Sequence, residues 1–131
     1  MGDVIGVASG KRVEFVDITD KVARYIEKSG VGEGLCCLYV PHTTAGVTIN
    51  EGADPSVVRD IITYLDKLVP HKGDYRHAEG NSDAHIKSSL IGNSATIMIK
   101  DGKPLLGTWQ AIFFCEFDGP RNRRLYIKIT G

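Results

Sequence analysis

The sequence lacks the features that mark several large classes of protein. No apolar run among its 131 residues approaches the ~20 residues that a membrane-spanning helix needs. Lys and Arg number 16, and so do Asp and Glu, so the net charge of zero provides no general attraction to nucleic acid. Internal repeats and low-complexity tracts are also absent. We therefore expect neither a membrane protein nor a nucleic-acid-binding protein.

Cysteine is scarce as well, with three residues and no CxxC pair, which excludes a zinc ribbon or a thioredoxin-like motif. Cys36 and Cys37 are neighbours on a predicted strand, so their side chains should point to opposite faces. Cys115 lies in an apolar run and is expected in the core. The first ten residues do not resemble a signal peptide. These observations predict a cytoplasmic protein with reduced thiols.

What is present fits one compact domain over residues 1–131, with 42% hydrophobic and 24% charged residues. Strands are predicted at 13–18, 35–40, 47–49, 96–100, 105–117 and 125–129. Helices are predicted at 20–27, from 55 to a boundary at Pro70, and at 83–90. The run 35–40 is apolar throughout and is expected to be buried on both faces. Because strands lie at both ends without regular βαβ alternation, we predict an α+β fold with a mainly antiparallel or mixed sheet.

Local signals fix several boundaries of these elements. Thr19 or Asp20 should cap the first helix, and Gly30 should end it. Asp54 should cap the second helix, with Pro55 in its first turn. Residues 71–83 are polar and aperiodic, which is typical of a surface loop, and Asp101 with the following glycine indicates a hairpin turn.

Three of the four histidines lie at junctions of predicted elements, and these are His42, His77 and His85. Imidazole is a common ligand of transition metals, and a zinc site with one open position needs three protein ligands. A turn at residue 80 would bring His77 toward His85, with His42 approaching from a strand end. The other interpretation is three solvated histidines without a common partner. His71 is expected at the surface.

Carboxylates and amides surround these histidines in the sequence. Glu51, Glu79 and Asp83 could orient the imidazoles or supply a general base. Glu51 is therefore a candidate catalytic residue together with the histidines.

Two further segments could bind a ligand. On a strand through residues 105–117, Thr108 and Gln110 would share one face and contact a polar ligand, while Trp109 points the other way. Alternatively, Trp109 fills the core and Gln110 bonds a neighbouring strand. The only compact basic group is formed by Arg121, Arg123 and Arg124, which either bind phosphate or decorate a solvated turn. Arg121 is best placed to point back toward the strand ends.

Taken together, these segments resemble the YjbQ family. The blocks that carry the resemblance are His42-Thr43-Thr44-Ala45, Asn50-Glu51, His77-Ala78-Glu79-Gly80-Asn81, Asp83-Ala84-His85, Gly107-Thr108-Trp109-Gln110 and Glu116-Phe117-Asp118-Gly119-Pro120-Arg121. The resemblance covers essentially the whole chain and implies a small α+β fold and a homotrimer. It also implies a site at the three histidines that can lie at a subunit boundary, with Glu51, Asn81, Gln110 and Arg121 as further members of the same pocket.

Members of this family are often labelled secondary thiamine-phosphate synthases, which implies a phosphorylated small-molecule substrate. In that reaction a thiazole nitrogen displaces pyrophosphate from a pyrimidine-methyl diphosphate. The implied cofactor is a divalent metal, either zinc or another transition metal at the histidines or magnesium with the diphosphate. Two other functions stay open: a metal-dependent hydrolase of a small phosphate ester, and a non-catalytic protein that binds a metal or an anion.

Overall fold

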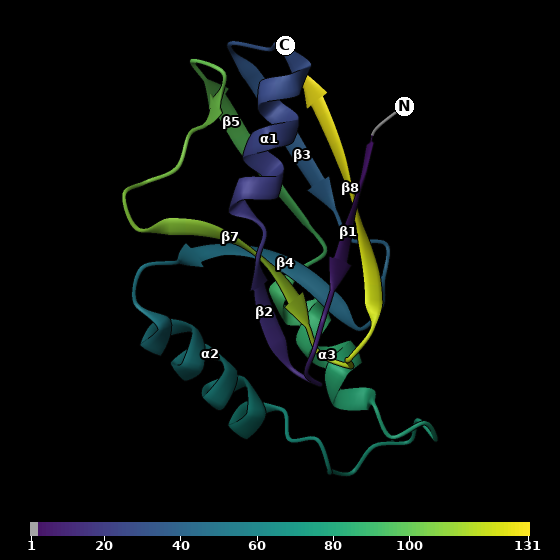
Figure 1. Cartoon of the computed structure of the whole chain (residues 1–131). Coiled ribbons are helices and arrows are strands. Elements are labelled where there is room, and N and C mark those ends of the chain that lie inside the picture. The colour runs from purple at the N-terminus through teal and green to yellow at the C-terminus, as the bar shows by residue number, and fades with distance from the viewer. Residues whose placement is uncertain (1–2) are drawn as a thin grey trace.

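Two antiparallel sheets and three helices make up the computed structural model, which describes residues 3–131 (Figure 1). The first sheet has the strand order β1-β8-β3-β5-β6, and the second has the order β2-β7-β4. The strands are β1 (Asp3–Ala8), β2 (Glu14–Asp17), β3 (Gly34–Tyr39), β4 (Ala45–Glu51), β5 (Ser94–Lys100), β6 (Lys103–Pro104), β7 (Gln110–Glu116) and β8 (Asn122–Thr130). The helices are α1 (Thr19–Ser29), α2 (Pro55–Leu68) and α3 (Ser82–Ile91). The predicted α+β class is confirmed.

The ends of the elements follow local backbone chemistry. Asp54 caps α2 as predicted, and its Oδ1 accepts the Ser56 N–H at 2.9 Å. Gly30 ends α1 at φ 73°, a left-handed conformation that glycine adopts without strain. The β5–β6 hairpin turns through Asp101 and Gly102, both at positive φ, as a type I′ turn requires.

The start of α1 differs from the prediction. Neither Thr19 nor Asp20 is the N-cap, a position that Ile18 occupies without a side-chain hydrogen bond. Asp17, the last residue of β2, accepts both the N–H and the hydroxyl of Thr19 instead. The predicted cap was therefore wrong, because Asp17, two residues before Thr19, holds the first N–H of the helix.

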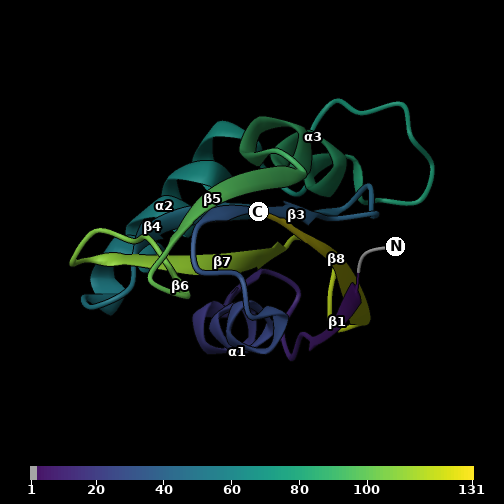
Figure 2. The same cartoon turned by 90° about the horizontal axis from the view of Figure 1, so that it is seen from above.

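The helices lie on opposite sides of the sheets, as the view from above shows (Figure 2). On the α1 side, a large apolar core contains Val22 and Ile26 of the helix together with Phe114 of β7. On the side of α2 and α3, a smaller core contains Phe113 and Phe117. Strand β7 thus lies between two cores, and each of its residues after Gln110 is buried.

The strand β3 is not buried on both faces, so that prediction was wrong. Its burial alternates: Cys36 and Leu38 are inside, whereas Leu35 and Tyr39 are 44% and 49% exposed. Cys37 is exposed, so the two adjacent thiols do point to opposite faces as predicted. Among residues 3–131, the side chains of this outer face, such as Leu35, Tyr39 and Met98, stay exposed, so an apolar run in this strand does not mean burial in the single chain.

The predicted strand over residues 105–117 was too long, because β7 begins only at Gln110. The preceding residues form a turn in which Gln110 Oε1 accepts the Gly107 N–H at 2.8 Å and the Gln110 N–H bonds the Gly107 carbonyl. Thr108 and Gln110 therefore do not share a strand face. Trp109 is 64% exposed, so it does not fill the core either.

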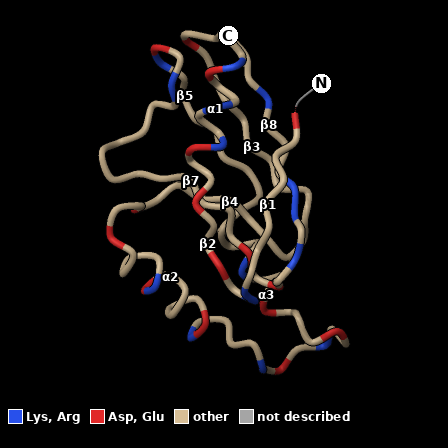
Figure 3. Tube along the Cα trace, in the orientation of Figure 1, with Lys and Arg blue, Asp and Glu red and all other residues tan. Residues whose placement is uncertain are grey.

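No helix among residues 3–131 is long and apolar enough to cross a membrane. Acidic and basic residues both occur along the helices α1 and α2, whereas β8 carries three basic residues and no acidic one (Figure 3). Strand β3, in the middle of the first sheet, carries no charged residue.

A buried ion-pair network joins the two helices on the outer side of the second sheet. Lys87 of α3 is fully buried, and its Nζ bonds Asp66 of α2 at 2.5 Å and Asp83 of α3 at 3.3 Å. Arg12, between β1 and β2, adds a bidentate contact to Asp83 at 3.0 and 3.1 Å. Burial by itself would raise the pKa of Asp83, but the hydrogen bonds and charges of Arg12 and Lys87 outweigh it and hold that pKa low.

Removal of the buried amine should destabilise the protein strongly. We expect Lys87→Met to lower the free energy of unfolding by about 3–5 kcal/mol, because Asp83 stays buried with one partner fewer. The matched change Lys67→Met, on the exposed side of α2, should cost about 0.5 kcal/mol or less. Urea unfolding of both variants measures the difference, and equal losses would contradict a structural role for Lys87.

Candidate functional site

The structure brings His42, His77 and His85 together around one cleft of about 470 Å³. His42 follows β3 in the chain, His77 lies in the loop between α2 and α3, and His85 is on α3. The remaining lining residues are Pro41, Thr43, Thr44, Glu79, Asn81, Asp118, Arg121 and Arg123. A second cavity of about 510 Å³ adjoins the first and is also lined by His42 and His85.

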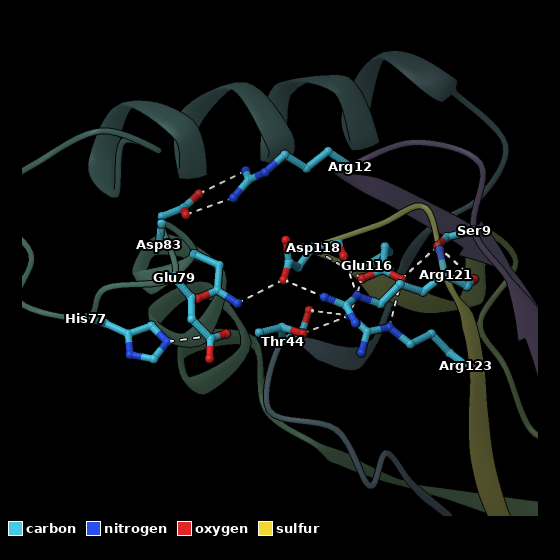
Figure 4. A network of polar contacts seen from close by, with 12 residues as sticks. Ser9, Arg12, Thr44, His77, Glu79, Asp83, Glu116, Asp118, Arg121 and Arg123 are labelled. Atoms are coloured by element: carbon cyan, nitrogen blue, oxygen red, sulfur yellow. Dashed lines mark hydrogen bonds and ion pairs between the residues drawn. The ribbon is translucent and has the colours of Figure 1, made fainter.

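Two of the imidazoles contact one another at the mouth of the cleft. The rings of His77 and His85 lie edge to face with centroids 5.3 Å apart. Glu79 approaches His77 from the same loop, with 3.8 Å between Oε2 and Nε2 (Figure 4). The exposed His77–Glu79 pair is within reach of a ligand that enters the cleft.

The third imidazole, His42, is held by the backbone of β8. Its Nε2 accepts the Arg124 N–H at 3.1 Å, so the proton of the neutral ring must sit on Nδ1. Partial burial lowers the pKa of His42, and the positive charge of Arg123 lowers it further. His42 is therefore a neutral imidazole whose Nδ1–H makes no hydrogen bond to any residue within 3–131, and it is free to donate to a ligand.

This arrangement bears on the predicted metal site. A metal-bound histidine normally coordinates through one nitrogen and donates the N–H of the other to an acceptor. In His42 the lone pair of Nε2 already accepts the Arg124 N–H, and Nδ1 carries the proton. Neither nitrogen therefore offers a free lone pair to a metal. The described part of the chain also contains no group of three His, Cys, Asp or Glu side chains arranged to hold a metal. His42 thus does not fit the role of a ligand in this conformation, and a zinc or other transition-metal centre stays a prediction.

Arg123, which also lines the cleft, forms a buried ion pair with Glu116 (Figure 4). Arg123 Nε donates to one carboxylate oxygen at 2.8 Å and a terminal nitrogen donates to the other at 2.5 Å. Arg123 also donates to the hydroxyl of Thr44, and Ser9 donates to Glu116. Burial by itself would raise the pKa of Glu116, but the hydrogen bonds from Arg123, Ser9 and the Asp118 N–H outweigh it, so the pKa lies below its ordinary value of 4.5.

Asp118 organises one wall of the cleft. Its Oδ2 accepts hydrogen bonds from the Asn81 amide at 2.9 Å and from Arg121 at 3.1 Å. Arg121 Nε also donates to the Asp118 carbonyl at 2.8 Å, which turns this half-exposed guanidinium back toward the cleft. Arg121 thus lies beside the histidines, whereas its neighbour Arg123 is buried in the pair with Glu116 rather than part of a solvated basic group.

Three predicted site residues lie elsewhere in the chain. Glu51, Thr108 and Gln110 line neither of these cavities. Strand β4 begins three residues after His42 and ends at Glu51, which pairs with Gln110 of β7. A strand of this length spans about 20 Å at ~3.3 Å per residue, so one chain holds these residues far from its own histidines.

Sequence reasoning missed the role of Glu116 and Arg123. The available signal was the position of Glu116, a carboxylate at the end of the apolar run Phe113–Cys115. A charge in such a run is buried only with a partner, but the sequence did not indicate which of the three nearby arginines would supply it.

Comparison with known proteins identifies the family of the chain and agrees with its fold. The model of the UPF0047 protein YjbQ-like family matches residues 3–131. The chain belongs to the YjbQ/UPF0047 family. A UPF0047 protein of Methanocaldococcus jannaschii is 62% identical over 125 residues, which cover 95% of this chain and 91% of that one. The UPF0047 protein YugU of Bacillus subtilis is 48% identical over 127 residues, which cover 95% of this chain and 96% of that one.

Solved YjbQ-family structures have the same architecture. A crystal structure of a YjbQ/UPF0047 protein from Clostridium acetobutylicum superposes with a TM-score of 0.96 at 52% identity and covers 98% of this chain and 99% of that one. A YbjQ-like protein from Sulfolobus solfataricus has a TM-score of 0.95 at 34% identity, with 100% and 96% covered.

The buried ion pair should give a diagnostic pH dependence. Because the pKa of Glu116 is depressed on folding, its contribution to stability is present above pH 4.5 and is lost as the pH falls toward the folded value. We expect Arg123→Met to cost about 3–5 kcal/mol near neutral pH, where the buried carboxylate has lost its partner. That cost should shrink as the pH falls, because the buried carboxylate without Arg123 is protonated at a higher pH than the paired one.

The control is Arg124→Met, which removes an exposed arginine while keeping the backbone N–H that bonds His42. Thermal unfolding of both variants between neutral pH and the acid range measures the effect. A cost of Arg123→Met that is the same at every pH would contradict the assignment of Glu116 as its charged partner.

Proposed function

We propose that the protein is a small-molecule enzyme that binds a phosphorylated substrate in the histidine cleft and catalyses a transfer of the thiamine-phosphate synthase type. The observation that carries the proposal is the convergence of the three histidines and Arg121 on one cleft. Guanidinium and imidazole N–H groups are suitable donors to phosphate oxygens. The resemblance to a family often labelled with this reaction supplies the choice of substrate.

The chemistry requires stabilisation of a leaving group. The bond between the methylene carbon and the diphosphate oxygen breaks, both electrons leave with pyrophosphate, and the thiazole nitrogen forms the new bond to carbon. Arg121 and the Nδ1–H of His42 would donate hydrogen bonds to the departing oxygens. A divalent cation bound to the diphosphate would neutralise part of its charge.

The test is formation of thiamine phosphate by the purified full chain with both substrates and magnesium, detected as fluorescent thiochrome. His42→Ala should reduce kcat by about 100-fold or more, the range for loss of a positioned proton donor. His42→Asn should retain part of the activity, because its amide nitrogen replaces Nδ1. His71→Gln is the control, since His71 lies outside the cleft and glutamine can still donate to the Gly80 carbonyl.

Absence of product with either magnesium or zinc would rule out the transferase. Release of phosphate from a chromogenic phosphate ester under the same conditions, dependent on His42 and His85, would favour the hydrolase instead.

We further propose that the chain assembles as a homotrimer with the site at a subunit boundary. The outer face of the first sheet exposes large apolar side chains, namely Val4, Leu35, Tyr39, Met98 and Tyr126. Tyr39 and Tyr126 stack there with ring centroids 6.5 Å apart. A second copy could also bring Glu51 and Gln110 to the histidine cleft, which they do not reach in their own chain.

Light scattering of the purified protein should give three times the chain mass of 14.3 kDa. Met98→Asp should dissociate the assembly, because the aspartate would be buried without a partner. If the site is shared, a mixture of inactive His42→Ala and inactive Glu51→Gln chains, refolded together, should recover part of the activity. A monomeric wild type would rule out this assembly.

A further inference from the structure

Asn81 occupies the N-cap position of α3 but does not cap the helix. Its side chain makes no hydrogen bond to the first N–H groups of α3, although asparagine is among the residues that do this best. The amide nitrogen donates instead to Asp118 Oδ2 at 2.9 Å. Because a carboxylate only accepts, this contact fixes the amide orientation and identifies the other atom as the oxygen.

That oxygen, Asn81 Oδ1, is buried and has no hydrogen-bond partner among residues 3–131. Only 9% of Asn81 is exposed, and the residue lines the histidine cleft. Asn81 Oδ1 thus neither caps the helix nor bonds any other group of the described chain. Both the missing cap and the unpaired buried acceptor lower the stability of the ligand-free protein. An unpaired buried acceptor is expected where a ligand supplies the missing donor.

The neighbouring groups define the rest of the ligand. Arg121 and the Nδ1–H of His42 present donors to the cleft, which suits an anion. Asn81 Oδ1 is an acceptor beside them. Asp118 Oδ2, which bonds the Asn81 amide, already accepts from both Asn81 and Arg121, and the other carboxylate of the cleft, Glu79, approaches His77.

We propose that the ligand of this cleft carries an N–H donor next to its phosphate or diphosphate group, and that Asn81 Oδ1 accepts this N–H and selects for it. The anionic half of the ligand rests on the proposed function, whereas the donor half rests on Asn81 alone. An amino-substituted heterocycle joined to a diphosphate has this combination of groups.

The test compares two probes by titration calorimetry: an aminopyrimidine-methyl diphosphate and its analogue with hydrogen in place of the amino group. The wild type should bind the amino compound at least about tenfold more tightly, because the analogue leaves Oδ1 unpaired. Asn81→Ser should bind the two probes within about twofold of each other, with the affinity for the analogue unchanged, since serine is a good N-cap residue but does not reach the ligand.

The control is Asn122→Ser, the same change at an exposed residue that lines neither cavity, and it should keep the discrimination. Equal affinities in the wild type, or no binding of either probe, would overturn the inference. Stabilisation of the wild type but not of Asn81→Ser by magnesium alone, without discrimination, would also overturn it and assign the oxygen to a cation. The wild-type comparison stands even if the variant does not fold.

The outcomes separate this inference from the proposed function. Tighter binding of the amino probe without formation of thiamine phosphate supports the role of Asn81 and excludes the transferase activity. Turnover of both probes with equal kcat/KM supports the transferase and removes the selective role of Asn81.

Discussion

The ion pair between Glu116 and Arg123 is the constraint on which the candidate site depends. Glu116 ends β7 in the second sheet and Arg123 lies at the start of β8 in the first, so the pair ties the two sheets together where their strands meet. Thr44, just before β4, and Ser9, just after β1, complete its hydrogen bonds. Because the loss of a partner strongly destabilises a buried charge, these four segments keep one relative position. His42, Asn81 and Arg121 of the cleft all lie on or beside these segments.

A second fixed unit lies behind α3, where Lys87, Asp83 and Arg12 link the helix to α2 and to the β1–β2 connection. His85 is on the same helix, two residues from both Asp83 and Lys87. The cleft is thus lined by α3 and by three connections without regular structure. These are the β3–β4 connection with His42, the α2–α3 loop with His77 and Glu79, and the β7–β8 connection with Asp118 and Arg121.

Much of the fold could be predicted from the sequence because the signals are local. Asp54 with Pro55 marked the start of α2, and Asp101 with Gly102 marked a hairpin, since each needs only the conformation of its own residues. Burial was harder to predict. Leu35–Tyr39 is as apolar as β7, but only β7 lies between two cores, and that difference depends on which helices cover which face. For the site, spacing suggested that the histidines meet, whereas the tautomer of His42 depends on the register of β8, which no local pattern encodes.

The hydrogen bond that fixes His42 comes from a main-chain amide. Every residue except proline supplies the same N–H at position 124, so the side chain there can change freely while the imidazole keeps its orientation and its proton. Strand pairing with β1 and β3 holds that amide in place. Substitutions at position 124 should therefore leave the tautomer and orientation of His42 unchanged. Proline is the one replacement that would remove this hydrogen bond, because it has no N–H.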